Sequence, residues 1–284
     1  MEIKKLAVLG AGLMGSGIAQ VAAYSGYRVS MMDVSEEMLE IGKKAIRKSL
    51  DRFVKSEKLS EDDADEVIKS IHTTTFMADA VDGAHLVIEA VPEDIALKKE
   101  VFKELEGLCA EGTILASNTT ELSITDIASV TGCPDKVIGM HWFNPAPLMK
   151  LVEIVAGVDT SDQTIQIIED VAQKMGKETV IVRDAQGFVT SRVLSAHMME
   201  CMRVLEEGVA SAEDIDKAVR LGLNYPMGPF ELADYVGLDT LLFASEGLTE
   251  AYGDRFRAPQ VLRKKVEAGH LGRKSGRGFY NYER

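Results

Sequence analysis

The sequence has little of what builds disulfide or metal scaffolds. Its 284 residues include only three cysteines, Cys109, Cys133 and Cys201, and no CxxC pair. An odd number of isolated cysteines argues against a disulfide framework, and nothing in their spacing suggests a zinc site. We therefore expect no bound metal and a reducing compartment, the cytoplasm.

Long apolar runs are also missing. The apolar run near the N-terminus is broken by glycines from Gly10 on, and no stretch approaches the roughly 18 apolar residues of a membrane-spanning helix. Hence we expect neither export nor membrane insertion.

Positive charge is in the minority. Lys and Arg number 32 against 45 Asp and Glu, which gives a formal net charge of -13 and argues against nonspecific binding to nucleic acid or anionic membranes. Hydrophobic residues make up 46% and charged residues 27%, an ordinary globular composition. At roughly 100 to 200 residues per domain, the length suggests one large domain or, as we favour, two.

Short apolar segments alternate with segments of helical spacing up to about residue 185. The predicted strands are 3–9, 28–33, 85–91, 113–117, 136–143, 148–157 and 178–184. This alternation predicts an α/β domain over 1–185, a doubly wound (Rossmann-type), mostly parallel sheet with helices on both faces. Residues 186–284 show only helical spacing, which predicts a second, all-helical domain.

A glycine-rich segment, Gly10-Ala11-Gly12-Leu13-Met14-Gly15, lies between the first predicted strand and a helix. In a GxGxxG fingerprint the glycines allow a tight turn, close approach of a pyrophosphate, and packing of helix on strand. Asp33 ends the second strand, where a carboxylate binds a ribose diol and repels a 2′-phosphate. We therefore favour NAD over NADP; the alternative is a turn that only joins strand to helix.

Residues 43–58, here called the basic segment, carry seven lysines and arginines against two acidic residues. Such a run is often a solvated helix face. Because the segment leaves the carboxyl edge of the predicted sheet, where ligands bind in open α/β folds, it could instead hold the phosphates of a nucleotide.

His141 is the candidate for chemistry among the five histidines. It lies at the end of a predicted strand, ahead of the loop WFNPAP, beside the expected cofactor cleft. Oxidation of a secondary alcohol needs a base of pKa near 7, and histidine suits that task. Glu153 stands in the apolar strand LVEIV, either as an outward-facing residue or as a buried partner that orients an imidazole.

Four motifs, GxGxxGSGIAQ, ASNT, HWFNPAP and GRKSGRGFYNY, give the chain a close resemblance to the L-3-hydroxyacyl-CoA dehydrogenase family, particularly its bacterial 3-hydroxybutyryl-CoA members. The resemblance implies an NAD domain, a helical domain that forms a dimer or a dimer of dimers, and an acyl-CoA substrate. The implied reaction is oxidation of (S)-3-hydroxyacyl-CoA to 3-ketoacyl-CoA, or the reverse.

The resemblance also implies roles for individual residues. It makes His141 the catalytic base and Glu153 the residue that orients it, and it adds Thr120 and Ser191 to the catalytic residues. The implied cofactor contacts are Gly10, Ala11, Gly12, Leu13, Met14, Gly15, Asp33, Glu93, Lys98, Asn118 and Lys274. The implied substrate contacts are Thr120, Ser49, Arg52 and Lys55.

Two positions depart from the family's pattern. Thr120 replaces a substrate-contacting serine and keeps its hydroxyl, whereas Ser191 replaces an asparagine and shortens the donor. These two substitutions leave open the alternative that the protein kept the fold and lost the enzymatic activity. A small β-hydroxyacid dehydrogenase with a catalytic lysine is a further alternative, although it would need neither HWFNP nor the basic segment.

An apolar stripe of Val193, Met198, Met202 and Leu205 is expected on the first helix after residue 186. A helical domain can bury such a stripe in its own core. The family resemblance favours the other reading, a surface that two subunits share in a dimer.

Overall fold

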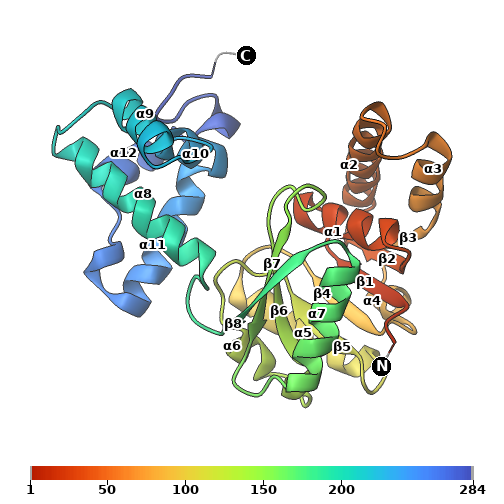
Figure 1. Cartoon of the computed structure of the whole chain (residues 1–284). Coiled ribbons are helices and arrows are strands. Elements are labelled where there is room, and N and C mark those ends of the chain that lie inside the picture. The colour runs from red at the N-terminus through yellow and green to blue at the C-terminus, as the bar shows by residue number, and fades with distance from the viewer. Residues whose placement is uncertain (1, 283–284) are drawn as a thin grey trace. The chain divides into compact units, whose positions relative to one another are not determined.

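The computed structural model describes residues 2–282 and shows two compact units, one up to Asp184 and one from Ala185 (Figure 1). The first unit contains an eight-stranded sheet in the order β3-β2-β1-β4-β5-β6-β7-β8. The strands are β1 (Lys5–Leu9), β2 (Arg28–Met32), β3 (Ile71–Thr74), β4 (Leu86–Glu89), β5 (Ile114–Ser117), β6 (Val137–Trp142), β7 (Leu151–Ala156) and β8 (Glu178–Arg183).

The first six strands of the chain run parallel to one another, β7 runs antiparallel to β6, and β8 runs parallel to β7. The predicted mostly parallel, doubly wound sheet is therefore confirmed. The strand order reverses between β1 and β4, and in open α/β sheets ligands bind in the crevice outside the carboxyl ends of such a pair.

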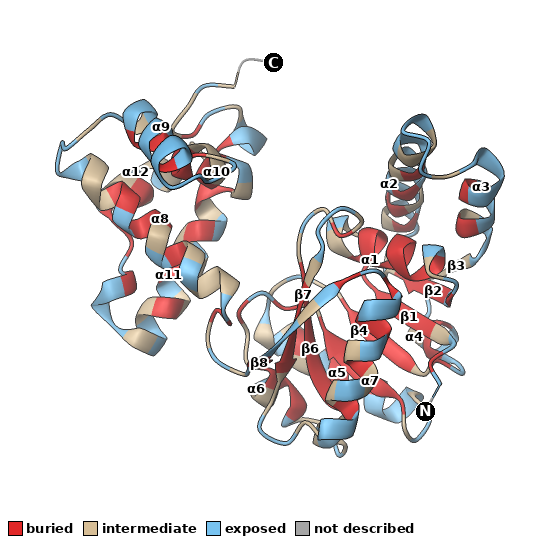
Figure 2. Ribbon diagram, in the orientation of Figure 1, coloured by how far each residue is buried: buried red, intermediate tan, exposed pale blue. Residues whose placement is uncertain are grey.

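Helices cover both faces of this sheet. They are α1 (Leu13–Tyr24), α2 (Glu36–Lys55), α3 (Glu61–Lys69), α4 (Met77–Val81), α5 (Ile95–Leu108), α6 (Ile124–Ala128) and α7 (Asp162–Lys174), with a short 3-10 helix η1 (Pro134–Lys136). Helices α1, α2, α3 and α7 share one apolar core with the strands. The inner strands are buried along most of their length, whereas the edge strands β3 and β8 are mostly not buried (Figure 2). Right-handed crossovers place α5 and α6 on the opposite face.

Helices α2 and α3 pack against each other and against α1. Each begins at a serine whose hydroxyl accepts a backbone N–H, Ser35 for α2 and Ser60 for α3. Leu39, Ile46 and Leu50 bury the inner side of α2. Most charged residues on the other side of α2 are exposed, so much of the basic segment lies on a solvent-exposed helix face.

The second unit consists of helices, as predicted. These are α8 (Thr190–Glu206), α9 (Ala212–Gly222), α10 (Pro229–Val236), α11 (Leu238–Tyr252) and α12 (Gln260–Glu267), with 3-10 turns η2 (Asp254–Phe256) and η3 (Arg273–Ser275). Met198 and Met202 of α8 are each 1% exposed in the core of this unit. The expectation that their stripe forms a dimer surface is therefore wrong, because the unit needs this face of α8 for its own core; Val193, at 64% exposure, lies outside that core.

Two buried carboxylates fasten the C-terminal motif GRGFYNY to the second unit. Asp234 accepts hydrogen bonds from the N–H groups of Phe279 and Tyr280, and Asp216 accepts one from the Tyr280 hydroxyl at 2.8 Å. A Cβ at Gly278 would lie 1.9 Å from Oδ1 of Asp234, so only glycine fits there. The motif is thus part of the packing of this unit.

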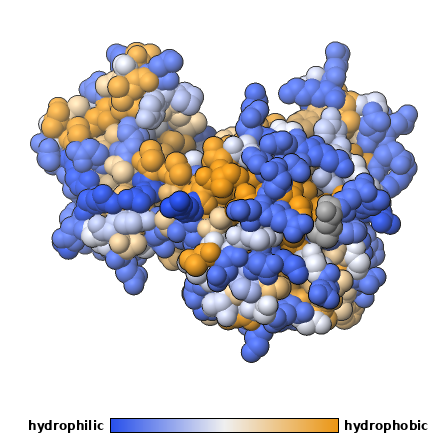
Figure 3. All heavy atoms as spheres, turned by 60° about the horizontal axis from the view of Figure 1, so that its bottom comes forward, coloured by the Kyte–Doolittle hydropathy of each residue, from blue (hydrophilic) through white to orange (hydrophobic). Residues whose placement is uncertain are grey.

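None of the helices within residues 2–282 is long and apolar enough to cross a membrane. Hydrophilic residues cover much of the face drawn in Figure 3.

Candidate active site

A cavity of about 630 Å³ opens at the predicted crevice. Its walls come from the turn after β1, the ends of β2 and β4, and the starts of α1, α2, α4 and α5. The fingerprint residues Gly10, Gly12, Leu13 and Met14 line it, together with Asp33. Sequence positions far apart in the chain thus meet where the strand order reverses.

Two glycines of the fingerprint, Gly10 and Gly15, are required by the local geometry. Gly10 has φ +99°, and a Cβ there would lie 2.6 Å from the carbonyl oxygen of Ala90. A Cβ at Gly15 would lie 1.9 Å from the carbonyl oxygen of Gly10, so Gly15 lets α1 approach the turn. By contrast, a Cβ at Gly12 would meet nothing within 4 Å, which leaves the backbone open toward the cavity.

Helix α1 begins at this opening without a side-chain cap, because its N-cap residue is Gly12. The first N–H groups of a helix attract anions, and here no side chain of the N-cap occupies them. The turn, the open backbone and the uncapped helix therefore fit a dinucleotide pyrophosphate.

Asp33 borders the cavity one residue after the end of β2. Its Oδ2 accepts a 2.9 Å hydrogen bond from the N–H of Ala11, and its Oδ1 accepts one from Ser35 at 3.2 Å. Each carboxylate oxygen can accept more than one hydrogen bond. Asp33 can therefore hold the glycine-rich turn and still bind a ribose hydroxyl.

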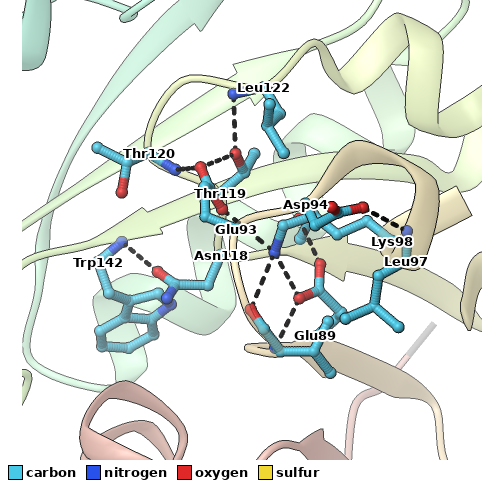
Figure 4. Close-up of polar contacts among 12 residues, drawn as sticks. Glu89, Glu93, Asp94, Leu97, Lys98, Asn118, Thr119, Thr120, Leu122 and Trp142 are labelled. Atoms are coloured by element: carbon cyan, nitrogen blue, oxygen red, sulfur yellow. Dashed lines mark hydrogen bonds and ion pairs between the residues drawn. The ribbon is translucent and has the colours of Figure 1, made fainter. Parts of the chain in front are cut away.

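A buried ionic cluster lies at the carboxyl ends of β4 and β5 (Figure 4). The ammonium of Lys98, fully buried, lies 2.6 Å from Oε1 of Glu89 and 3.3 Å from Oε2 of Glu93. Ser117 donates a 2.6 Å hydrogen bond to the second oxygen of Glu89. Lys98 and Glu93, both expected cofactor contacts, are thus held together, and Lys98 can act on a ligand through Glu93.

Glu93 also fixes the loop that follows β5. Its Oε1 accepts hydrogen bonds from the hydroxyl of Thr119 at 2.6 Å and from the N–H of Thr120 at 2.8 Å. Oδ1 of Asn118 accepts a 3.0 Å hydrogen bond from the N–H of Trp142 in β6. Asn118 and the exposed Thr120 are therefore held beside the end of β6, the strand that carries His141.

His141 and Glu153 face each other directly across the antiparallel pair of β6 and β7. Nδ1 of His141 lies 2.6 Å from Oε2 of Glu153, and the two residues are 5% and 0% exposed. The ring of Phe143 lies 4.4 Å from the imidazole, centroid to centroid. Of the two readings of Glu153, the structure thus shows the buried partner of an imidazole.

A lysine supports the loop that joins these two strands. Lys177 is 7% exposed and donates hydrogen bonds to the carbonyl oxygens of Ala146 at 2.6 Å and Met149 at 2.7 Å. Burial lowers the pKa of Lys177. Its ammonium also lies 5.6 Å from the centre of the Trp142 ring. The buried ammonium of Lys177 therefore fixes the backbone of the loop after His141.

Glu121 is a buried carboxyl close to this site. It is 3% exposed, and its Oε2 has no hydrogen-bond partner within residues 2–282. Burial, and after it the charge of Glu93, raises the pKa of Glu121 to about 7. The loop that carries Thr120 thus includes a group that changes its charge near neutral pH.

The remaining predicted site residues belong to α2 and to the second unit. Ser49 is half-buried on α2, whereas Arg52 and Lys55 are exposed on its last turns. In the second unit, Ser191 lies in the first turn of α8, and Lys274 lies in η3 with its ammonium 2.6 Å from the carboxylate of Asp239.

Sequence reasoning missed several residues of the site. Glu89 was not singled out, although a carboxylate that ends the apolar strand LVIE is a visible signal. The antiparallel turn into β7 was also missed, although eight residues are too few for a parallel crossover, which needs a dozen or more. That connection length would have paired His141 with a residue of β7.

Two family models match the chain almost from end to end. The NAD binding domain of 3-hydroxyacyl-CoA dehydrogenase matches residues 5–185. The C-terminal domain of 3-hydroxyacyl-CoA dehydrogenase matches residues 187–282.

Individual relatives agree over the full length. A Bacillus subtilis protein named "Probable 3-hydroxybutyryl-CoA dehydrogenase" is 49% identical over 100% of this chain and 99% of its own. The 3-hydroxybutyryl-CoA dehydrogenase of Clostridioides difficile is 43% identical over 99% of this chain and 100% of its own. The crystal structure of (S)-3-hydroxybutyryl-CoA dehydrogenase from Ralstonia eutropha has a TM-score of 0.96 at 42% identity and covers 100% of both chains.

A doubly wound sheet with a dinucleotide fingerprint where its strand order reverses defines an NAD-dependent dehydrogenase. The full-length matches then make the finer assignment: the chain belongs to the 3-hydroxyacyl-CoA dehydrogenase family. The resemblance, the fold class and the NAD cofactor predicted from the sequence are confirmed. The small β-hydroxyacid dehydrogenase is set aside, because both domain models match this other family.

Proposed function

We propose that the chain oxidises (S)-3-hydroxyacyl-CoA, chiefly 3-hydroxybutyryl-CoA, to 3-ketoacyl-CoA and catalyses the reverse reduction. The observation that carries the proposal is the buried hydrogen bond of 2.6 Å between His141 and Glu153 at the carboxyl edge of the sheet. The acyl-CoA class is supported by the names of the relatives that are 49% and 43% identical.

His141 is the general base for oxidation and the general acid for reduction. With Nδ1 bonded to Glu153, Nε2 is the ring nitrogen that exchanges the proton of the substrate's 3-hydroxyl. Glu153 keeps the ring in one tautomer and stabilises the imidazolium that forms. Bound NAD⁺ supplies the hydride acceptor.

The cofactor is held by residues of the first unit. The N–H groups at the start of α1 and the open backbone at Gly12 bind the pyrophosphate, and Asp33 binds the ribose next to adenine. Glu93 and Asn118 contact the nicotinamide half, and Lys98 positions Glu93. The second unit contributes Lys274 as a further cofactor contact.

The substrate is held at both of its ends. The hydroxyl of Thr120 and that of Ser191 bind the oxygen at C3 or the thioester, as hydrogen-bond donors. At the CoA end, Ser49, Arg52 and Lys55 of α2 bind phosphates, since a chain with net charge -13 attracts a polyanion through a local positive field. We further propose that the protein acts in the cytoplasm as a homodimer or a dimer of dimers.

The test is NADH oxidation with acetoacetyl-CoA, with longer 3-ketoacyl-CoA substrates, and with free acetoacetate. We expect the highest kcat/KM with acetoacetyl-CoA and little turnover of free acetoacetate. Equal rates with free acetoacetate would contradict a CoA-dependent enzyme. Absence of turnover with any of them would favour a protein that kept the fold and lost activity.

A further inference from the structure

Four of the 13 methionines of the chain line the cavity at the fingerprint. Met14 lies in the first turn of α1, Met32 ends β2, Met38 lies in the first turn of α2, and Met77 begins α4. Apart from Asp33, the described residues that line this cavity carry no charge. Its wall is therefore apolar and rich in thioether sulfur.

These methionines differ in exposure from the three that pack in the core of the second unit. Met14, Met38 and Met77 are half-buried at the cavity, and Met32 is 7% exposed. Met198, Met199 and Met202 are at most 1% exposed inside a packed core. A small solute that enters the cavity reaches the first group and is excluded from the second.

We propose that Met14, Met38 and Met77 form an oxidation site inside the cofactor cavity, where peroxide attack lowers the affinity for NAD(H). The inference rests on the proposed binding of NAD to this cavity. In each step the thioether sulfur attacks one oxygen of hydrogen peroxide, the O–O bond breaks and an S–O bond forms. Sulfur loses two electrons, and the peroxide is reduced to one water molecule.

The sulfoxide changes the cavity in two ways. It adds a strongly polar oxygen to an apolar wall, and that oxygen must be desolvated when the base of the cofactor enters. It also stiffens and enlarges a side chain whose thioether adapts easily to an aromatic ring. His141 and Glu153 do not line the cavity, so the damage falls on cofactor binding rather than on proton transfer.

The experiment treats the enzyme with hydrogen peroxide, with and without saturating NAD⁺, and then removes both. Peptide mass spectrometry records which methionines gain one oxygen atom, and steady-state assays give KM for NADH and kcat. The readout is KM after treatment divided by KM before it, so that each protein is its own reference. We expect about a tenfold rise in this KM, little change in kcat, and protection by NAD⁺.

Two variants and one enzyme treatment complete the design. A triple variant, Met14→Leu with Met38→Leu and Met77→Leu, nearly conserves volume and cannot form the sulfoxides, so its KM ratio should stay near one. The matched control is Met149→Leu, at a methionine that is 41% exposed outside the cavity, and it should respond as the wild type does. Methionine sulfoxide reductases should restore the wild type, whereas a thiol reductant alone should not.

Several results would overturn the proposal. One is an unchanged KM for NADH although Met14, Met38 and Met77 are oxidised, and another is the absence of oxidation at all three. The others are a triple variant as sensitive to peroxide as the wild type, and full recovery with a thiol reductant alone. Failure of NAD⁺ to protect, together with an unaltered KM for NADH in Asp33→Ala, would show instead that the cavity is not the cofactor site. The two failures can thus be told apart.

Discussion

Asp33 has two tasks, since its carboxylate holds the glycine-rich turn through Ala11 and faces the cavity. We expect kcat/KM to be higher for NADH than for NADPH by about tenfold or more, because the carboxylate repels a 2′-phosphate and binds the ribose diol. Asp33→Asn keeps an acceptor for the Ala11 N–H and removes the charge. It should therefore lower the ratio of kcat/KM for NADH to kcat/KM for NADPH. Comparable kcat/KM values for the two cofactors in the wild type would contradict this role.

Glu121 makes stability depend on pH. Its pKa in the folded protein is raised from 4.5 to about 7, so its contribution to stability is fully present below the unfolded value and is lost as the pH rises through about 7. The stability of Glu121→Gln relative to the wild type should therefore increase from about pH 5 to about pH 8, by up to about 3 kcal/mol. Urea unfolding of both proteins at the two pH values measures the difference. The exposed Glu104→Gln is the control, and an equal pH dependence of wild type and Glu121→Gln would refute the assignment.

Single residues also show how far the sequence could be interpreted. The fingerprint was predictable because Gly10 and Gly15 are fixed by local backbone geometry. The bond from Glu93 to Thr120 joins residues 27 positions apart, and no periodicity announces such a contact. Local patterns therefore located the cofactor turn, whereas the buried cluster behind it required the fold.

At the scale of elements, the pairing of β6 with β7 determines the geometry of the candidate active site. Each strand was predictable from its apolar run, but their antiparallel register brings His141 opposite Glu153. For α8, the sequence indicated the apolar stripe but not the surface that buries it. Met198 packs inside the core of its own unit and not against a second subunit. Amphipathic spacing shows that a face is buried without showing what buries it.

The exposed face of α2 gives a test of the basic segment. Lys48→Glu with Lys55→Glu should raise KM for acetoacetyl-CoA several-fold and leave KM for NADH nearly unchanged, because the charges act on the CoA phosphates. The wild-type KM for acetoacetyl-CoA should also rise with salt, as the Debye length shortens to about 8 Å at 0.15 M. Steady-state kinetics over a range of salt concentrations measures both effects.

The matched control reverses two exposed lysines outside the segment, Lys4→Glu with Lys103→Glu, and so makes the same change in net charge. If both double variants behave alike, or if neither variant nor salt alters KM for acetoacetyl-CoA, the basic segment is only a solvated helix face.

For the whole molecule, we expect an oligomer. Because Met198 and Met202 are used inside the second unit, any dimer surface must come from other residues of the chain. Light scattering at micromolar concentration should give at least twice the chain mass of 31.0 kDa. A monomer with full activity would contradict the dimer.

The central claim is that a cofactor-binding dehydrogenase transfers its substrate proton through His141. The most direct measurement compares kcat with acetoacetyl-CoA and the dissociation constant of NADH in wild type, His141→Asn and, as control, the exposed His72→Asn. We predict that His141→Asn lowers kcat by about 100-fold or more and leaves NADH binding nearly unchanged, since only the base is lost. Near-normal turnover of His141→Asn, or an equal loss in His72→Asn, would contradict the account.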